Sequence, residues 1–323
     1  MSGLALPVFF VVMFSLCYIS AFHSPQPNHM PVILVGSTQE TQAVVAKVAA
    51  SNGGKFDFTE TTDPNIAQSQ VMSREVVGAI VLGDQAKTYV ATAGGPTAAT
   101  VVRGLAASLT PQGTTPEVVD LRPLPAGDPG GTSLFYFVII CTLAGYLTIT
   151  VLSQAAPGLG IGGTIGFLAI MAVVAPVLVY LIGGVGFGAY SGSASAIWSM
   201  LGIGALYAFL IGLVAMDCTL LLGPGSIFAM LTIFVFINFP SSGGAIPASM
   251  LPSFWAFFNH FWAGASAVNA VRSVLYFDGS GAGQALLVLW AWAAAWLLLL
   301  VAPVAMRVKR RRAGALENAV APL

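Results

Sequence analysis

The sequence predicts a mainly α-helical, multi-pass membrane protein with six transmembrane helices and an extracytoplasmic α/β domain inserted between the first two. Hydrophobic residues make up 57% of the 323-residue chain and charged residues only 7%, whereas roughly 25% of the residues in an average soluble domain are charged. Between Pro129 and Met306 the sequence contains three charged residues, Asp217, Arg272 and Asp278. A stretch so poor in charge is typical of a chain that is embedded in lipid.

Six apolar runs are long enough to cross a bilayer. A spanning helix needs about 20 mainly apolar residues, because the hydrocarbon core offers no water to satisfy free backbone groups. We therefore expect a first transmembrane helix in residues 1–23 and a five-helix transmembrane domain in residues 133–306. The predicted spans are Leu4–Phe22, Leu134–Leu152, Thr164–Val185, Ala196–Asp217, Leu220–Phe239 and Gln284–Met306.

The distribution of Lys and Arg sets the expected orientation, because loops rich in these residues stay in the cytoplasm. The segment "RVKRRR", Arg307–Arg312, is the only such cluster beside a predicted span. It places the basic tail, residues 307–323, in the cytoplasm, and with six spans the N-terminus is cytoplasmic as well. Residues 24–132 are then extracytoplasmic, and the protein is expected in the plasma (inner) membrane.

The first apolar run is predicted to be a permanent anchor rather than a cleaved signal peptide. No basic residue precedes it and no small-x-small cleavage site follows it, and it is longer than the usual signal-peptide stretch of roughly 7–15 apolar residues. Cys17, Cys141 and Cys218 all fall in or beside predicted spans. We expect these cysteines to be small apolar core residues that form no disulfide.

Between Pro31 and Arg122 the apolar runs shorten to strand length and acidic residues become frequent, which indicates a folded α/β domain. Asp63 followed by Pro64 is predicted to begin a helix, as an N-cap and a proline at the first helical position do. Apolar or alternating runs predict strands, and 3.6-residue spacing predicts helices. In chain order we expect strand Pro31–Gly36, helix Thr38–Ala50, strand Phe56–Thr61, the helix after Asp63, a hairpin of strands Val76–Gly83 and Lys87–Ala93, helix Thr97–Ser108 and strand Glu117–Leu121.

No motif of this domain points to catalysis. His23 and His29 have no acidic or thiol neighbour at a metal-ligand spacing, so we interpret them as linker residues and expect no metal and no cofactor. The Gly-rich stretch Ala93–Pro96 lacks the Lys and the spacing of a nucleotide-binding loop and is predicted to be a turn. A binding or structural domain is favoured, and nucleic acid is not expected as a partner.

The predicted spans themselves contain many small residues, for example Gly160–Gly166 and Gly183–Ser195. We expect them to let helices approach closely, with a flexible translocation path as the alternative. Apart from Asp217 the spans hold no ionisable acid, base or histidine, which disfavours an ion-driven carrier. The chain has no GxxxxGK[ST] loop, so it is not expected to hydrolyse ATP or to be an enzyme.

Two short amphipathic helices are predicted at about 251–277, lying in the outer membrane interface. The second has an apolar stripe of Val268, Val271 and Leu275, with polar residues on the opposite side. The first has one aromatic face that serves as an interfacial anchor. Its anchor residues are Phe254, Phe257, Phe258, Phe261 and Trp262.

The candidate functional residues are polar or charged groups in or beside these apolar segments: Arg272, Asp278, Asn269, His260 and Asp217. Two interpretations of this stretch remain open. In one, Arg272 reaches lipid phosphate groups and Asp278 caps the following turn; in the other, they contact a substrate. Asp217 either contacts a partner or ends a helix at the inner surface.

The segments "REVVGAIVLG" (Arg74–Gly83) and "FPSSGGAIPASMLPSFWAFFNHFWAGASAVNAVRSVLYFDG" (Phe239–Gly279) resemble those of a known family. With the predicted topology, they make the chain similar to the ABC-2 type permeases, the membrane subunits of type V ABC exporters. The resemblance is greatest to actinobacterial members related to the YhgE/Pip (phage infection protein) group and to SNG1-like membrane proteins. The more specific part is the Ser-Gly-Gly-x-x-Pro turn, the aromatic helix and the Arg ahead of Tyr-Phe-Asp-Gly.

The resemblance implies a homodimer, or a pair of related permeases, that exports a hydrophobic or amphiphilic, lipid-like or drug-like compound. A separate ATPase subunit would supply the energy. The alternative is a non-transporting surface receptor or assembly scaffold whose extracytoplasmic domain binds a protein partner. The loop Ser153–Gly163, which contains no charge with which to dock an ATPase, motivates this alternative.

Overall fold

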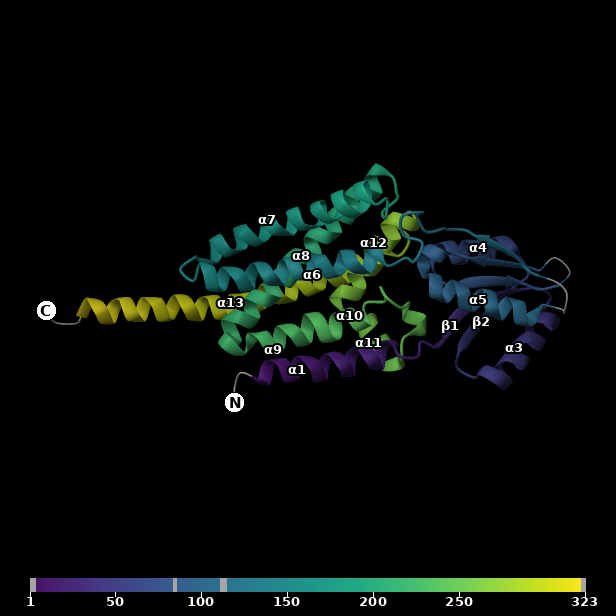
Figure 1. Cartoon of the computed structure of the whole chain (residues 1–323), viewed down its shortest axis with the longest axis horizontal. Helices are drawn as coiled ribbons and strands as arrows, with labels where there is room; N and C mark the ends of the chain where they lie inside the picture. Colours follow the sequence, from purple (N-terminus) through teal and green to yellow (C-terminus); the bar gives the residue numbers. More distant parts are fainter. Residues whose placement is uncertain (1–3, 84–85, 111–114, 321–323) are drawn as a thin grey trace.

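The computed structural model describes residues 4–83, 86–110 and 115–320. Long helices form a bundle, and an α/β domain lies at one end of it (Figure 1). Within the described residues, five helices are long and apolar enough to cross a membrane, so the chain is a helical membrane protein. They are Ala5–Phe22 (α1, Ala5–Phe14, continued by α2, Ser20–Phe22), Ser133–Ala155 (α6), Ile161–Gly186 (α7, Ile161–Tyr180, and its continuation), Ala194–Leu222 (α8) and Ala282–Val301, the first part of α13 (Ala282–Val320).

The predicted fifth span, Leu220–Phe239, is divided between two helices. Its first residues belong to α8, which runs on to Leu222, and the turn Gly223–Gly225 follows. A shorter apolar helix, Ser226–Ser241, begins after this turn and runs from α9 (Ser226–Leu231) to α10 (Asn238–Ser241). The described residues therefore contain five apolar helices of spanning length and one shorter apolar helix. The side chains of the predicted basic tail, 307–323, lie outside the described part of the chain.

The α/β domain contains a mixed five-stranded sheet, and the predicted strands are confirmed. Strand β1 (Met30–Val35) pairs in parallel with both of its neighbours, while β3 and β4 form the expected antiparallel hairpin. The strand order is β2 (Phe56–Thr61), β1, β3 (Gly78–Val81), β4 (Lys87–Val90) and β5 (Glu117–Asp120).

Three helices cover the sheet: α3 (Thr38–Asn52), α4 (Pro64–Ser73) and α5 (Pro96–Leu109). The predicted start of α4 is confirmed, since the Asp63 carboxylate accepts a hydrogen bond from the backbone N–H of Asn65 (2.8 Å). The predicted turn at Ala93–Pro96 is confirmed as well. It comprises a 3-10 turn and Gly95, and it leads into α5 at Pro96.

Alternate residues of β1 face opposite sides of the sheet, as the pleat requires. Met30 and Val32 pack in a cluster with α5, whereas Ile33 and Val35 belong to a cluster that includes α4. The second cluster continues without a break into the helical bundle, where it includes Phe137. The two parts of the molecule therefore share one hydrophobic core.

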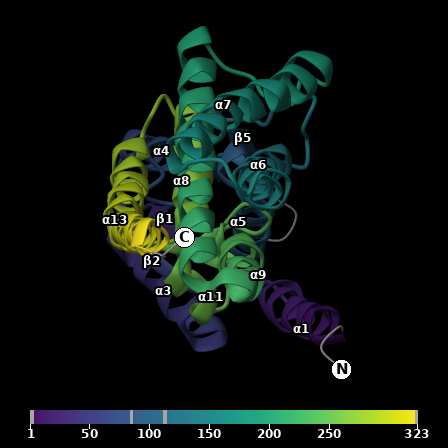
Figure 2. The same cartoon turned by 90° about the vertical axis from the view of Figure 1, so that its left-hand side faces the viewer.

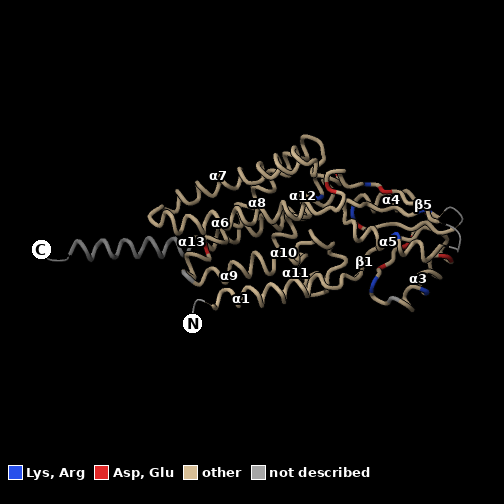
Figure 3. Tube along the Cα trace, in the orientation of Figure 1, with Lys and Arg blue, Asp and Glu red and all other residues tan. Residues whose placement is uncertain are grey.

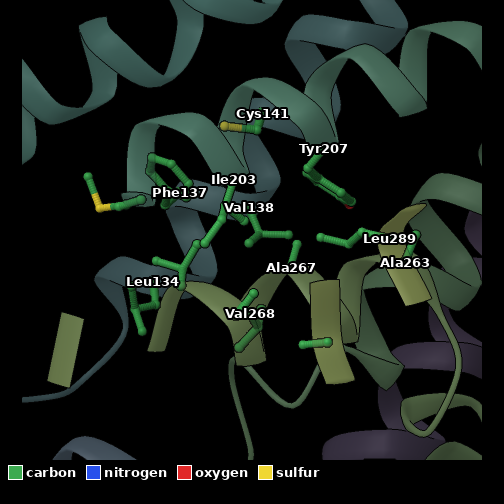
Figure 4. Packing of buried hydrophobic residues seen from close by; sticks show 14 of the residues in the cluster. Leu134, Phe137, Val138, Cys141, Ile203, Tyr207, Ala263, Ala267, Val268 and Leu289 are labelled. Carbon is green, nitrogen blue, oxygen red and sulfur yellow. The ribbon is translucent and has the colours of Figure 1, made fainter. Parts of the chain in front are cut away.

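Helix α8 is the centre of the bundle, where it packs against α6, α7, α12 (Ala263–Tyr276) and α13 (Figure 2). Figure 4 shows this packing, with Phe137 and Cys141 of α6, Tyr207 of α8, Val268 of α12 and Leu289 of α13 in one cluster. The three cysteines are free and buried, as expected. Helix α1 lies at the edge of the bundle, where it contacts the segment that contains α9 through aromatic pairs such as Phe9 with Phe228.

The prediction that both helices of 251–277 lie in the membrane interface is wrong for the second. Twelve of the fourteen residues of α12 are buried, and Val268 and Arg272 are among them. One side of α12 packs on α8 and α13, and its polar side is covered by the α/β domain. Amphipathic spacing indicates that a helix has one apolar and one polar face. It does not indicate whether the polar face contacts water or, as in α12, polar groups of another part of the protein.

The first helix, α11 (Ser253–Asn259), does have an exposed aromatic side, on which the side chains of Phe254 and Phe257 are mostly accessible. Asn259 points away from this exposed aromatic side and into the protein. Its amide is buried and donates to the carbonyl oxygen of Ser241 (2.7 Å). On the same buried side of α11, one turn before Asn259, the Trp255 indole donates to the Ser20 hydroxyl (3.2 Å). Helix α11 therefore lies beside the end of the first apolar helix.

Candidate functional site: a cavity between the two domains

A cavity of about 650 Å³ lies where the α/β domain meets the helical bundle. The α/β domain contributes Val71, Arg74 and Gly95 to its wall. The helical part contributes residues of α11 and α12 and of the loop between α10 and α11, residues 242–252. Most of the lining is apolar, with a few polar side chains. These dimensions and this lining are typical of a binding site for a small organic ligand, roughly 300–1,000 Å³ in volume.

Arg272 projects from α12 into this cavity although its side chain is almost fully buried, with 6% of its surface exposed. One terminal nitrogen, Nη2, donates to the carbonyl oxygen of Gly243 in the α10–α11 loop (3.1 Å). The inner nitrogen Nε has no hydrogen-bond partner among the described residues. Arg272 is therefore a buried cation with unused hydrogen-bonding capacity.

The beginning of the α10–α11 loop is held in place by side chains of α11 and α12. Gly243 has a φ of 70°, a conformation that favours glycine, and a Cβ there would approach Asn259 Nδ2 to 2.9 Å. The bonds from Arg272 to Gly243 and from Asn259 to Ser241 fix its beginning. This loop forms the floor of the cavity beneath the α/β domain.

Arg74 reaches the same cavity from the opposite side. It ends α4 in the left-handed conformation (φ 67°), which directs the following chain back into the sheet. Its guanidinium donates to Ser273 Oγ (2.6 Å) and to Asn269 Oδ1 (2.9 Å), and it lies 5.3 Å from the ring centre of Phe277. Arg74 thus joins the α/β domain to the polar side of α12.

The cavity has an excess of positive charge. Arg74 and Arg272 line it, and no Asp or Glu is among its described lining residues. Burial lowers the pKa of Arg74 to about 10, and burial together with the charge of Arg74 lowers the pKa of Arg272 to about 9. Both groups remain cationic at neutral pH, and their mutual repulsion is not neutralised by a carboxylate in the wall.

The carboxylates near the cavity have other partners. Asp128 lines a smaller neighbouring pocket together with Arg272, but its two oxygens accept from the backbone N–H groups of Thr132 and Ser133 at the start of α6. Asp57 lies 3.1 Å from His29, on the exposed edge of the sheet. Neither carboxylate forms an ion pair with Arg74 or Arg272.

The structure brings three of the predicted candidate residues, Arg272, Asn269 and His260, together in the cavity wall. Asp278 lies outside the wall and pairs with Arg122 of the α/β domain, an interaction that also connects the two parts. Phe257 is the one predicted aromatic anchor in the wall. Phe254, Phe258, Phe261 and Trp262 lie along the same surface, and Trp262 contacts Trp292 of α13.

Asp217 lies near the C-terminal end of α8 and is not among the residues that line the cavity. It is fully buried, and neither carboxylate oxygen has a hydrogen-bond partner within the described residues.

Arg74 is the functional candidate that sequence reasoning missed. It opens the segment Arg74–Gly83 that was singled out as a family marker, but nothing in its local pattern indicates that it reaches α12.

The fold and the cavity define a helical membrane protein with a ligand-sized space between its two domains. No protein-family model matches the chain, and no curated protein or solved structure is significantly similar to it. Its function is therefore inferred from the residues that surround this space.

Proposed function

We propose that this protein is the membrane permease subunit of an ABC-2 type exporter that moves a hydrophobic or amphiphilic compound out of the cell. In this proposal the α/β domain is extracytoplasmic, both termini are cytoplasmic, and the chain works as a homodimer or with a related permease. The observation that carries the proposal is the largely apolar 650 Å³ cavity at the junction of the two domains. A compound leaving the membrane at this end of the bundle would enter it.

The position of α11 supports an amphiphilic substrate. The Trp255–Ser20 hydrogen bond holds this helix beside the end of the helix Ala5–Phe22, so it lies at the level where that apolar segment ends. Phe257 belongs both to its exposed aromatic side and to the cavity wall. The exposed aromatic side of α11 and the cavity wall therefore meet at Phe257, where a compound with an apolar part could enter.

In this proposal ATP hydrolysis takes place on a separate subunit. The test is to reconstitute the protein in nanodiscs with each ATPase subunit encoded beside it and to measure ATP turnover. We expect stimulation by an amphiphile in the wild type. In the variant Ala256→Trp, which fills the cavity from α11, we expect none. The matched control Ala46→Trp lies on the exposed side of α3. Unchanged turnover with every such ATPase would contradict the proposal.

The alternative, a receptor or assembly scaffold, is favoured by the absence of charge in the connection between α6 and α7. Because the α/β domain shares its core with the bundle, deleting it would expose apolar surface, so a point variant is the better test. Strand β5 lies at the edge of the sheet, and Val118 on it is 44% exposed. If a protein partner docks on this edge, Val118→Lys should abolish its capture while the protein remains folded.

A further inference from the structure

Two cationic side chains, the buried Arg272 and the partly buried Arg74, line a cavity whose wall is mostly apolar, and no Asp or Glu among the described lining residues neutralises them. Taking a charge out of water is costly unless an opposite charge or good hydrogen bonds compensate for it. Arg74 is compensated in part, because Asn269 and Ser273 accept its hydrogen bonds. Arg272 has a single carbonyl partner and an unpartnered Nε. The site as described is therefore electrostatically incomplete.

We infer that the cavity binds the anionic headgroup of an amphiphile, a phosphate or carboxylate, between Arg272 and Arg74, with the apolar tail directed past α11 towards the lipid. The inference rests on the proposed function in taking this cavity as the substrate site. It adds that the substrate carries a negative charge and names the two side chains that recognise it.

The donor geometry fits an oxyanion. A guanidinium presents its N–H groups in a planar fork that matches carboxylate and phosphate oxygens, and such charge-assisted bonds are stronger than neutral ones. Arg272 is bound to Gly243 through Nη2, its Nε is buried without a partner among the described residues, and the residue lines the cavity. Arg74 adds positive charge from the α/β domain. Because the two arginines come from different domains, a bound anion would also hold the domains together.

The apolar part of the wall accounts for the tail. Val71 and Val76 line the cavity from the α/β domain, and Phe257 lines it from α11. From Phe257 the exposed aromatic surface continues to Phe254 and Phe261. This surface lies at the level where the first apolar helix ends, so a tail that leaves the cavity along it remains in contact with lipid.

Binding is tested on the full-length protein in a neutral detergent, with dodecyl phosphate as the probe. Decanol serves as the neutral amphiphile and inorganic phosphate as the free anion. We expect saturable binding of dodecyl phosphate and weaker binding of the other two probes, because only the first supplies both charge and tail. Equal binding of decanol would overturn the inference, and equal binding of inorganic phosphate would show a free-anion site rather than an amphiphile site.

The variants Arg272→Gln and Arg74→Gln are each expected to weaken dodecyl phosphate binding by about tenfold or more, the loss typical of a charge-assisted hydrogen bond. The matched control Arg103→Gln removes an arginine of α5 that does not line the cavity and should leave binding unchanged. If either cavity variant bound as well as the wild type, its arginine would have no part in recognition.

The thermal unfolding midpoint without ligand gives a second readout that a merely structural role would not produce. Arg272→Gln gives up the bond from Nη2 to Gly243, because the glutamine side chain is shorter, but it also removes an uncompensated buried charge, whose cost is larger, so its midpoint should equal or exceed that of the wild type. A lowered midpoint with unchanged affinity would make Arg272 a structural residue. If Arg272→Gln did not fold, Ala256→Glu, which places a carboxylate in the same wall, should weaken binding of the anionic probe and spare decanol.

The two proposals fail separately. If the protein bound dodecyl phosphate but stimulated no ATPase, the anion site would be supported and the exporter function contradicted. If neutral amphiphiles stimulated an ATPase and Arg272→Gln did not change this stimulation, the exporter function would be supported and the anion site contradicted.

Discussion

A chain of hydrogen bonds crosses the helical bundle at Tyr207. The Thr142 hydroxyl donates to the carbonyl oxygen of Val138 (2.7 Å), so the Tyr207 hydroxyl donates to Thr142 (2.8 Å). The Tyr207 oxygen accepts from the Asn238 amide (2.8 Å), and the Asn238 oxygen accepts from the backbone N–H of Gly264 (2.9 Å). Thr142, Tyr207 and Asn238 are almost fully buried, and the network satisfies them while it links α6, α8, α10 and α12.

Replacing Tyr207 by Phe would leave the Asn238 amide and the Thr142 oxygen without this partner. We expect the free energy of unfolding to fall by about 1–2 kcal/mol, measured by unfolding in mixed detergent micelles. Tyr146→Phe is the matched control on α6, because the Tyr146 hydroxyl makes no hydrogen bond within the described residues. Equal stability of the two variants would contradict the network.

Arg272 and Asp278 are the only charged residues between Asn259 and Gly279, but Arg272 is buried whereas Asp278 is exposed. Its side chain is 80% exposed and pairs with Arg122, and its φ of 53° is one that Asn also tolerates. We expect Asp278→Asn to change the free energy of unfolding by less than about 1 kcal/mol, as for other exposed ion pairs, and to leave ligand binding unchanged. A large loss of binding would assign Asp278 to the site.

At the scale of the elements, glycines set how closely the helices approach. A Cβ on Gly145 of α6 would meet the carbonyl oxygen of Ala208 and would lie 3.0 Å from the backbone nitrogen of Gly212, both on α8. Neither atom can move without shifting the helix. The expectation that small residues serve helix packing is supported at this crossing, whereas Gly202, on another side of α8, faces open space.

Gly145→Ala should therefore lower the free energy of unfolding by about 1–3 kcal/mol through overpacking. Gly202→Ala should leave it unchanged or raise it, because alanine favours the helix and nothing lies in the way. Thermal unfolding of the two variants in the same detergent gives the comparison. If helix propensity rather than close packing governed the α6–α8 crossing, Gly145→Ala would raise the free energy of unfolding as Gly202→Ala does.

Sequence reasoning was most successful for the α/β domain. Its strands and helices are short, locally encoded and bounded by Gly, Pro and capping residues such as Asp63, so pattern and turn chemistry agree. It was less successful for α12, whose polar side is covered by Arg74 from a segment nearly 200 residues earlier in the chain. No local pattern contains such a contact. The predicted span Leu220–Phe239 begins too early, before the turn at Gly223–Gly225 that separates α8 from the helix Ser226–Ser241. The apolar character of the sequence continues through this turn, so hydropathy alone does not locate it.

At the scale of the whole molecule, charge separates the two parts. Figure 3 shows the charged residues concentrated in the α/β domain and at its junction with the bundle, while the described bundle is almost free of them. The junction combines a shared hydrophobic cluster with the interactions of Arg74 with α12 and Arg122 with Asp278. This arrangement supports an α/β domain that is held against the bundle rather than tethered by linkers.

The proposed orientation is tested by cysteine labelling of intact cells with a membrane-impermeant maleimide. Ala46→Cys on the exposed side of α3 should be labelled, whereas Gln154→Cys, at the end of α6 remote from the α/β domain, should react only after the cells are opened. The native cysteines are buried and should contribute little background. The reverse labelling pattern would place the α/β domain in the cytoplasm.

The sequence by itself determined that this is a helical membrane protein with an α/β domain, because composition, run length and strand periodicity are local properties of the chain. It also drew attention to Arg272, as a charge in an apolar stretch. Only the tertiary structure decided what surrounds that charge. The guanidinium is buried against Gly243 and lies across a cavity from Arg74 because the α/β domain folds back onto α12. The charge and shape of a site between two domains depend on contacts between distant segments, and these exist only once the chain has folded.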